Sequence, residues 1–313
     1  MQTSYKNFLS IPITCFIAMQ LLYCNNAGTS SSVFLKDPLS IKLQACGSAG
    51  VGLTTDNNAG VINPAAADTE HIGVMAGGGI TTFQSQYAQL FAGIPVFSRG
   101  VLKAFCNFIN DTGMKEYNAY GKKMGDFSDT AGYAGLGYSQ KISDRLAIGG
   151  AVQYIFETDI NSTFSPSLGA TYLLSDIWDI GIAASNIGKF GGFPLPMRIT
   201  IGNALQLGNF VILLDAGWYK DSGIYVAGGP EFSIAEVIYL RAGINTIMLK
   251  QNSLFSALTF GVGIKPSDVF RFDYVIIPKE FGMEHKISVS FSFSTEHAAT
   301  NTGSQEGGGQ YEW

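Results

Sequence analysis

Charged residues are scarce in this chain, and long apolar runs are almost absent. Asp, Glu, Lys and Arg together make up 14% of the 313 residues, whereas soluble proteins carry about a quarter. Membrane-spanning helices need about 20 consecutive apolar residues, and the one long apolar run, residues 8–23, is interrupted by Pro12 and Gln20. Yet 46% of the chain is hydrophobic. This combination indicates strands that have one apolar and one polar face, as in a membrane β-barrel.

Histidine and cysteine are also few, with three and four residues. We therefore expect no metal site, no cofactor and no enzymatic activity. His285 and Ser288 are an odd number of residues apart on one expected strand, so they face opposite sides. A net charge of −5 leaves no basic stripe for nucleic acid. Cys46 and Cys106 are expected to be free thiols, because Cys106 lies on an apolar stripe.

The first residues have the order of a secretory signal peptide. Lys6 precedes an apolar segment at residues 8–22, and small and polar residues follow up to Gly28. We interpret residues 1–28 as a cleaved leader. The alternative is a lipoprotein signal that is cleaved before Cys24, but the bulky Tyr23 stands where such signals need a small residue.

Strict alternation of apolar and polar residues is clearest at 255–264, 269–276 and 287–293. A basic side chain that faces the middle of the bilayer costs roughly 2–4 kcal/mol. The charged members of such strands must therefore face the lumen, and we assign Arg198, Arg241, Arg271 and Asp273 to it. We expect Arg271 and Asp273 to form a structural ladder with Arg241 and Glu231. A soluble β-sandwich is the alternative, but its exposed face would carry more charge.

The same alternation, traced backwards from the C-terminus, predicts an all-β transmembrane antiparallel barrel of about fourteen strands over residues 71–293. Connectors are short at one end, and the longest ones, expected on the extracellular side, are 111–130, 188–196, 247–254 and 277–284. Residues 33–70 do not alternate and are interpreted as a plug inside the lumen. Residues 294–313 are predicted to be a disordered polar tail.

One stretch resembles a known family. Residues 43–65, LQACGSAGVGLTTDNNAGVINPA, run from a glycine-rich segment through an acidic turn to Asn63-Pro64-Ala65. This order is similar to the opening of PorV- and FadL-type outer-membrane proteins. Weaker matches follow in the same order as in that family. They lie at residues 125–129, 141–149, 186–188, 195–202, 240–243, 272–278 and 285–293. The whole resemblance covers residues 34–293.

The resemblance implies two functions. FadL-type proteins are fourteen-stranded barrels of the outer membrane that admit long-chain fatty acids or other hydrophobic compounds, and their plug ends near the Asn-Pro-Ala motif. PorV-type proteins have the same barrel but serve as docking and shuttle components of a protein secretion system. For this chain we expect passive uptake, with docking as the alternative. A general porin is disfavoured because the plug leaves no open pore.

The resemblance also implies sites and partners. Asn63, Pro64 and Ala65 would belong to the plug. The expected partners are outer-membrane lipid, a hydrophobic ligand such as a long-chain fatty acid, secretion-system proteins in the alternative, and the barrel-assembly machinery. No loop is long enough for the outer groove of fatty-acid transporters. We expect the hydrophobic route to pass a group of apolar plug residues: Phe34, Leu35, Leu39, Ile41 and Leu43.

Overall fold

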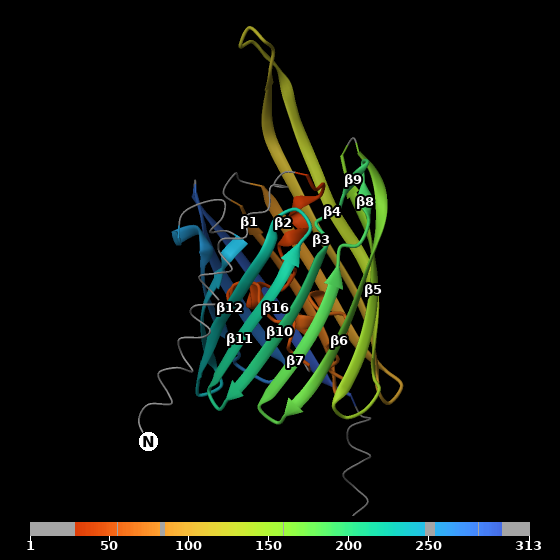
Figure 1. The fold of residues 1–313 in the computed structure, drawn as a ribbon. Helices are drawn as coiled ribbons and strands as arrows, with labels where there is room; N and C mark the ends of the chain where they lie inside the picture. Colours follow the sequence, from red (N-terminus) through yellow and green to blue (C-terminus); the bar gives the residue numbers. More distant parts are fainter. Residues whose placement is uncertain are drawn as a thin grey trace, which may run out of the picture.

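The wall of the molecule is a single β-sheet that closes on itself. The computed structural model describes residues 29–54, 56–81, 85–158, 160–247, 254–280 and 282–295. Fourteen antiparallel strands follow one another around the barrel, and the first pairs with the last from His71–Ser294 to Ile80–His285 (Figure 1). The predicted fold class is confirmed. The expected leader at 1–28 and all of the expected tail beyond Thr295 lie outside the described residues.

The strands follow chain order around the barrel, each next to the one before it. A separate two-stranded sheet, β8 (Lys189–Phe190) and β9 (Phe193–Pro194), interrupts the series between β7 and β10. The strands of the wall are β1 (His71–Ile80), β2 (Gln86–Val96), β3 (Gly100–Tyr117), β4 (Lys123–Lys141), β5 (Leu146–Glu157), β6 (Ile160–Ser175), β7 (Trp178–Ser185), β10 (Arg198–Leu207), β11 (Phe210–Tyr219), β12 (Gly223–Ile234), β13 (Ile238–Asn245), β14 (Leu258–Ile264), β15 (Phe270–Lys279) and β16 (Gly282–Ser294).

Burial alternates along these strands as the sequence pattern predicts. Ile201 and Leu214 face outward and are 57% and 51% exposed, whereas the adjacent Thr200 and Asp215 face the lumen and are 1% exposed. Successive side chains of a strand point to opposite faces of a sheet. A closed sheet therefore presents an apolar outer surface while its polar side chains lie inside.

Two of the expected loops are largely strand instead. Residues 277–284 form a tight hairpin, since β15 continues to Lys279 and β16 begins at Gly282. Within 111–130, β3 continues to Tyr117 and β4 begins at Lys123, so this segment is a two-stranded ribbon that projects beyond the barrel rim (Figure 1). Both predictions were wrong. Strand residues of the ribbon have water on both faces and show no apolar alternation, and Pro278 in the hairpin is a residue that strand interiors usually exclude.

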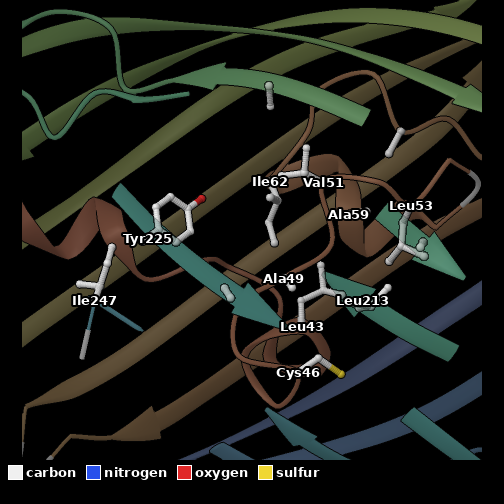
Figure 2. Close-up of a cluster of buried hydrophobic side chains, with 14 of the residues drawn as sticks. Leu43, Cys46, Ala49, Val51, Leu53, Ala59, Ile62, Leu213, Tyr225 and Ile247 are labelled. Atoms are coloured by element: carbon white, nitrogen blue, oxygen red, sulfur yellow. The ribbon is translucent and has the colours of Figure 1, made fainter. Parts of the chain in front are cut away.

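The N-terminal segment fills the lumen. It contains three short helices, η1 (Val33–Lys36), α2 (Ile41–Gln44) and η2 (Asn57–Val61). None of the described helices is long and apolar enough to cross a membrane. Figure 2 shows part of the resulting core, where Leu43, Val51 and Ile62 of the plug pack near Leu213 and Tyr225 of the wall. The core of the molecule thus lies between the plug and the barrel wall.

One substitution at two positions tests this orientation. Phe260 on β14 and Phe127 on the ribbon are similarly exposed, at 45% and 50%, but only Phe260 faces the expected bilayer. We expect Phe260→Arg to reduce the free energy of unfolding in lipid vesicles by about 2–4 kcal/mol near mid-bilayer, and Phe127→Arg to change it by less than about 0.5 kcal/mol. Urea titration of the heat-modifiable band measures both. Equal losses would contradict the membrane assignment.

Candidate functional site

Glycine lines the lumen at several places where the plug lies against the wall. A methyl group at Gly169 would overlap the Asn63 side-chain oxygen, and one at Gly149 would overlap the Pro64 carbonyl. The plug backbone therefore lies directly on the wall, which only glycine permits. Six wall strands contribute such positions: Gly149, Gly169, Gly181, Gly202, Gly243 and Gly261.

Polar wall side chains hold the backbone of the plug between these glycines. The Asp215 carboxylate accepts hydrogen bonds from the backbone N–H groups of Gly50 and Val51 at 2.9 and 3.1 Å. Three strands away, on β14, the Thr259 hydroxyl accepts from the Gly47 N–H and donates to the Ala45 carbonyl, both at 3.1 Å. Buried backbone groups need such partners. The wall side chains therefore provide hydrogen bonds that the irregular plug backbone cannot form within itself.

The Asn63-Pro64-Ala65 turn is held from two sides. The Asn63 amide donates to the carbonyls of Val51 and Ala170 at 2.8 and 3.2 Å, and its oxygen accepts from the Ala65 N–H at 3.1 Å. The ammonium of Lys103 on β3 donates to the carbonyl of Pro64 at 2.7 Å and to that of Ala66. Lys103 is 1% exposed and has no described carboxylate within ion-pair distance.

Sequence reasoning did not single out Lys103. A signal was present: Leu102 and Ala104 lie on the apolar stripe, so the lysine between them must face the lumen. Nothing in the pattern indicated that its partners are two plug carbonyls.

Three of the four charged residues assigned to the lumen form one ion network. Arg241 lies 2.5 Å from Glu231 and 2.8 Å from Asp273, and Arg271 lies 3.3 and 3.1 Å from the same two carboxylates. Two positive and two negative groups thus neutralise one another. The arrangement crosslinks β12, β13 and β15, and it leaves no free charge with which to select a solute.

The fourth residue, Arg198, differs from these three. Its Nε donates to the Ser185 hydroxyl at 3.3 Å and its NH1 to the Tyr219 hydroxyl at 3.4 Å. No carboxylate in the described part of the chain lies within ion-pair distance. Arg198 lines a cavity of about 40 Å³ together with Leu35 and Leu39 of the plug. The structure therefore brings together three residues that the sequence singled out, two in the plug and one in the wall.

The other candidates for a hydrophobic route differ in where they pack. The Phe34 ring stacks on Tyr133, which also lines the Arg198 cavity, with the ring centres 6.3 Å apart. Ile41 packs against Val275 and Ile277, and Leu43 belongs to the separate core cluster shown in Figure 2. The apolar plug residues therefore do not line one continuous passage.

The outer surface of the wall carries a hollow of about 610 Å³ over β1–β6, with apolar side chains such as Leu90 and Leu136 at its edge. Small residues form much of its floor, among them Ala104, Ala134 and Gly135. Phe105 lines both this hollow and the inner cavity. One aromatic side chain therefore belongs to both spaces.

The remaining chemistry-bearing residues lie apart from one another. His285 is exposed, and its Nδ1 lies 2.7 Å from the Tyr274 hydroxyl, whereas Ser288 is buried on the inner face. Cys46 is buried in the plug and Cys106 lies on β3, and both thiols are free. No group of three or more His, Cys, Asp or Glu residues is placed to hold a metal within the described ranges.

Comparison with solved structures shows which known proteins share this barrel. The CymD monoaromatic hydrocarbon channel has a TM-score of 0.58 and 12% identity, covering 83% of this chain and 98% of its own. The Pseudomonas putida toluene transporter TodX gives 0.56 and 14%, with 80% and 96% covered. The Ralstonia pickettii toluene transporter TbuX gives 0.54 and 12%, with 86% and 98% covered. At these identities the similarities show a shared barrel fold, which is the fold that the sequence resemblance implied.

No protein-family model matches the sequence, and no curated protein sequence matches it. The three solved neighbours above are described as channels or transporters.

The hold of Lys103 on the plug can be tested directly. Lys103→Met keeps the apolar stem but leaves the carbonyls of Pro64 and Ala66 unpaired. We expect it to lower the free energy of opening of residues 63–66 by about 1–3 kcal/mol, measured as faster amide hydrogen exchange. Lys265→Met, which removes an exposed ion pair with Asp268 in a turn, is the control. Unchanged exchange at residues 63–66 in Lys103→Met would show that other contacts hold the turn.

Proposed function

We propose that this protein is an outer-membrane channel for passive uptake of hydrophobic compounds that carry a carboxylate, of which long-chain fatty acids are the simplest. The short turns at one barrel end and the projecting ribbon at the other fit a barrel whose ribbon end is extracellular. The uptake proposal depends on one observation, the unpaired guanidinium of Arg198 at the wall of a cavity lined by Leu35 and Leu39.

Arg198 supplies what an amphipathic acid needs. A buried guanidinium is unfavourable without an anion, and its planar fork matches a carboxylate in a bidentate arrangement. The neighbouring Leu35 and Leu39 offer apolar contact to the chain of the same ligand. The other lumenal arginines are neutralised by Glu231 and Asp273. Asp37 also lines the cavity, but its charge is paired with Lys286 at 3.8 Å. Arg198 is therefore the lumenal arginine best suited to accept an acidic head group.

Binding also requires the plug to move. The cavity of about 40 Å³ has room for water only, while pockets for small ligands measure roughly 300–1,000 Å³. Displacement of Leu35 and Leu39 would enlarge it. Rotation of Phe105 would connect the enlarged space with the apolar hollow on the lipid-facing surface, and the ligand could then pass into the membrane.

Thermal melting in detergent tests the Arg198 site. We expect hexadecanoate to stabilise the wild type by mass action, by about 2.7 kcal/mol at a hundred times its dissociation constant. Hexadecanol, which has the same chain and no charge, should stabilise it less. Arg198→Met should remove the difference between the two ligands. The control Arg99→Met changes an exposed turn arginine that pairs with Asp144 and should keep it.

A preference for hexadecanoate that survives Arg198→Met would refute this site. Equal stabilisation by both ligands, abolished by Leu39→Asp, would instead indicate uptake of uncharged hydrophobic compounds.

The ribbon favours a second candidate, the PorV-like docking role. Beyond the rim, its strands pair only with each other. It also exposes several large side chains to water: Tyr117 at 56%, Tyr120 at 95%, Met124 at 62% and Phe127 at 50%. Exposed aromatic groups of this kind are typical of protein interaction sites.

A ribbon variant separates the two roles. We expect Tyr117→Ser/Tyr120→Ser/Phe127→Ser to leave barrel assembly and the response to hexadecanoate unchanged, because the ribbon lies outside the wall and the cavity. If docking is the function, this variant should lose a protein that co-purifies with the wild type in stoichiometric amount. A partner that stays bound to the variant would contradict docking through the ribbon.

A further inference from the structure

The Arg198 cavity is covered on one side by a short segment, residues 33–39, which we call the strap. Leu35, Asp37 and Leu39 of the strap line the cavity directly. The strap lies near the ribbon end of the barrel, where the Asn186 amide donates to the Leu35 carbonyl at 3.4 Å. Just before the strap, the Ser31 N–H donates to the Pro194 carbonyl at 3.1 Å. Any ligand that reaches Arg198 from this end must pass the strap.

Two ion pairs tie the strap to separate parts of the wall. The Lys36 ammonium lies 2.7 Å from Asp221, between β11 and β12, and donates to the Ser222 hydroxyl at 2.8 Å. The Asp37 carboxylate lies 3.8 Å from the ammonium of Lys286 on β16. Strands β13, β14 and β15 separate β12 from β16. The two adjacent strap residues are therefore attached across the barrel mouth.

Charge favours this closed arrangement. Burial raises the pKa of Asp37, but the positive charges of Lys286, Lys279 and Lys36 outweigh that effect and lower the pKa overall. Asp37 therefore remains ionised at neutral pH, and its attraction to Lys286 is present there.

Apolar packing and hydrogen bonds also hold the strap. Leu35 and Leu39 are buried, and the Gln44 amide donates to the Pro38 carbonyl at 2.6 Å. Ser32, which precedes η1, has a left-handed φ of 53° and makes no capping hydrogen bond, a conformation that costs free energy for a residue other than glycine. The side-chain oxygen of Ser32 is buried without a hydrogen-bond partner.

The two ion pairs are the charged contacts of the strap with the wall, and another carboxylate can compete for their cations. Lys286 already pairs with Glu284 at 3.2 Å as well as with Asp37.

A shared aromatic ring connects the strap to the cavity. The Lys36 ammonium lies 5.5 Å from the centre of the Tyr219 ring, and the Arg198 guanidinium lies 5.9 Å from the centre of the same ring. The Tyr219 hydroxyl also accepts the hydrogen bond from Arg198. Two cations therefore lie along one possible path, Lys36 at the mouth and Arg198 beneath it.

We propose that the Lys36–Asp221 and Lys286–Asp37 salt bridges form an ionic clasp over the Arg198 cavity, and that Lys36 is a second carboxylate-binding residue, which Asp221 occupies in the closed state. A ligand carboxylate that replaces Asp221 on Lys36 opens the clasp and then reaches Arg198. This inference rests on the proposed function for the identity of the ligand, but the clasp itself does not require it.

Exchange of the charges of Lys36 and Asp221 tests the clasp, and the measurement needs no ligand. The probe is Leu39→Cys in a Cys46→Ser/Cys106→Ser background, labelled with a membrane-impermeant maleimide. We expect Lys36→Asp and Asp221→Lys each to raise the labelling rate by about fivefold, which is the upper end for a partly exposed ion pair. The double variant should return within about twofold of the parent, since the two changes are coupled. Asp268→Lys, which breaks the 2.8 Å pair with Lys265 at the other barrel end, should change nothing.

A second arm tests the carboxylate at Lys36 separately from Arg198. In the same probe protein with Arg198→Met, hexadecanoate should accelerate labelling about fivefold, and hexadecanol should not. The double charge swap, which places Asp at position 36, should abolish that acceleration. Heat-modifiable migration confirms the folded barrel in every variant.

The outcomes are distinct. Single swaps that leave the labelling rate unchanged, or a double swap that labels as fast as the singles, would overturn the clasp. Equal effects of hexadecanoate and hexadecanol in the second arm would overturn carboxylate binding at Lys36. The proposed uptake site is tested separately by the melting experiment with Arg198→Met, which uses none of the Lys36 or Asp221 variants. A negative result there would refute the uptake site and leave the clasp untouched.

Discussion

The pleat of a closed sheet is the constraint on which this structure depends. Every wall residue faces either the bilayer or the lumen, because side chains alternate along a strand and a closed barrel has no free edge within the membrane. The outer positions must be apolar, so chemistry is confined to the inner ones. Gly169, Asp215 and Lys103 all occupy inner positions and all contact the plug. The wall sequence thus encodes a plugged barrel as well as a membrane protein.

The plug is stable in the lumen because the wall supplies two different things. Glycine allows the plug backbone to approach closely, and Asp215, Thr259 and Lys103 provide hydrogen-bond partners for its N–H and carbonyl groups. An irregular segment could not otherwise be buried, since unpaired backbone groups are costly. The short helices of the plug, at most five residues long, satisfy few of these groups by themselves. The plug therefore depends on the wall for its fold.

The alternation of residues predicted the wall strands apart from the ribbon, and the lumenal side of the four charged residues assigned to it, because a sequence displays alternation directly. The assignment of Asn63-Pro64-Ala65 to the plug came from the family resemblance. The sequence could not show that Arg271 and Arg241 would share Glu231 and Asp273 while Arg198 would find no acid, because register between strands decides those distances. The ribbon was missed for a related reason, since strand residues surrounded by water need not alternate. The partners of Lys36 and Lys103 could not be predicted from the sequence, because they depend on the path of the plug through the lumen.

The two kinds of attachment of the plug imply an order of opening. Residues 50–66, the lower plug, are held by buried hydrogen bonds at Lys103, Asp215 and Asn63. The strap is held by apolar packing and also by ion pairs near the mouth, which a carboxylate can displace. The strap should therefore open first and leave the lower plug closed. A ligand admitted in this way would reach Arg198 but would find the base of the lumen still filled. The nearest apolar space then lies sideways, past Phe105 toward the outer hollow, rather than downward through the barrel.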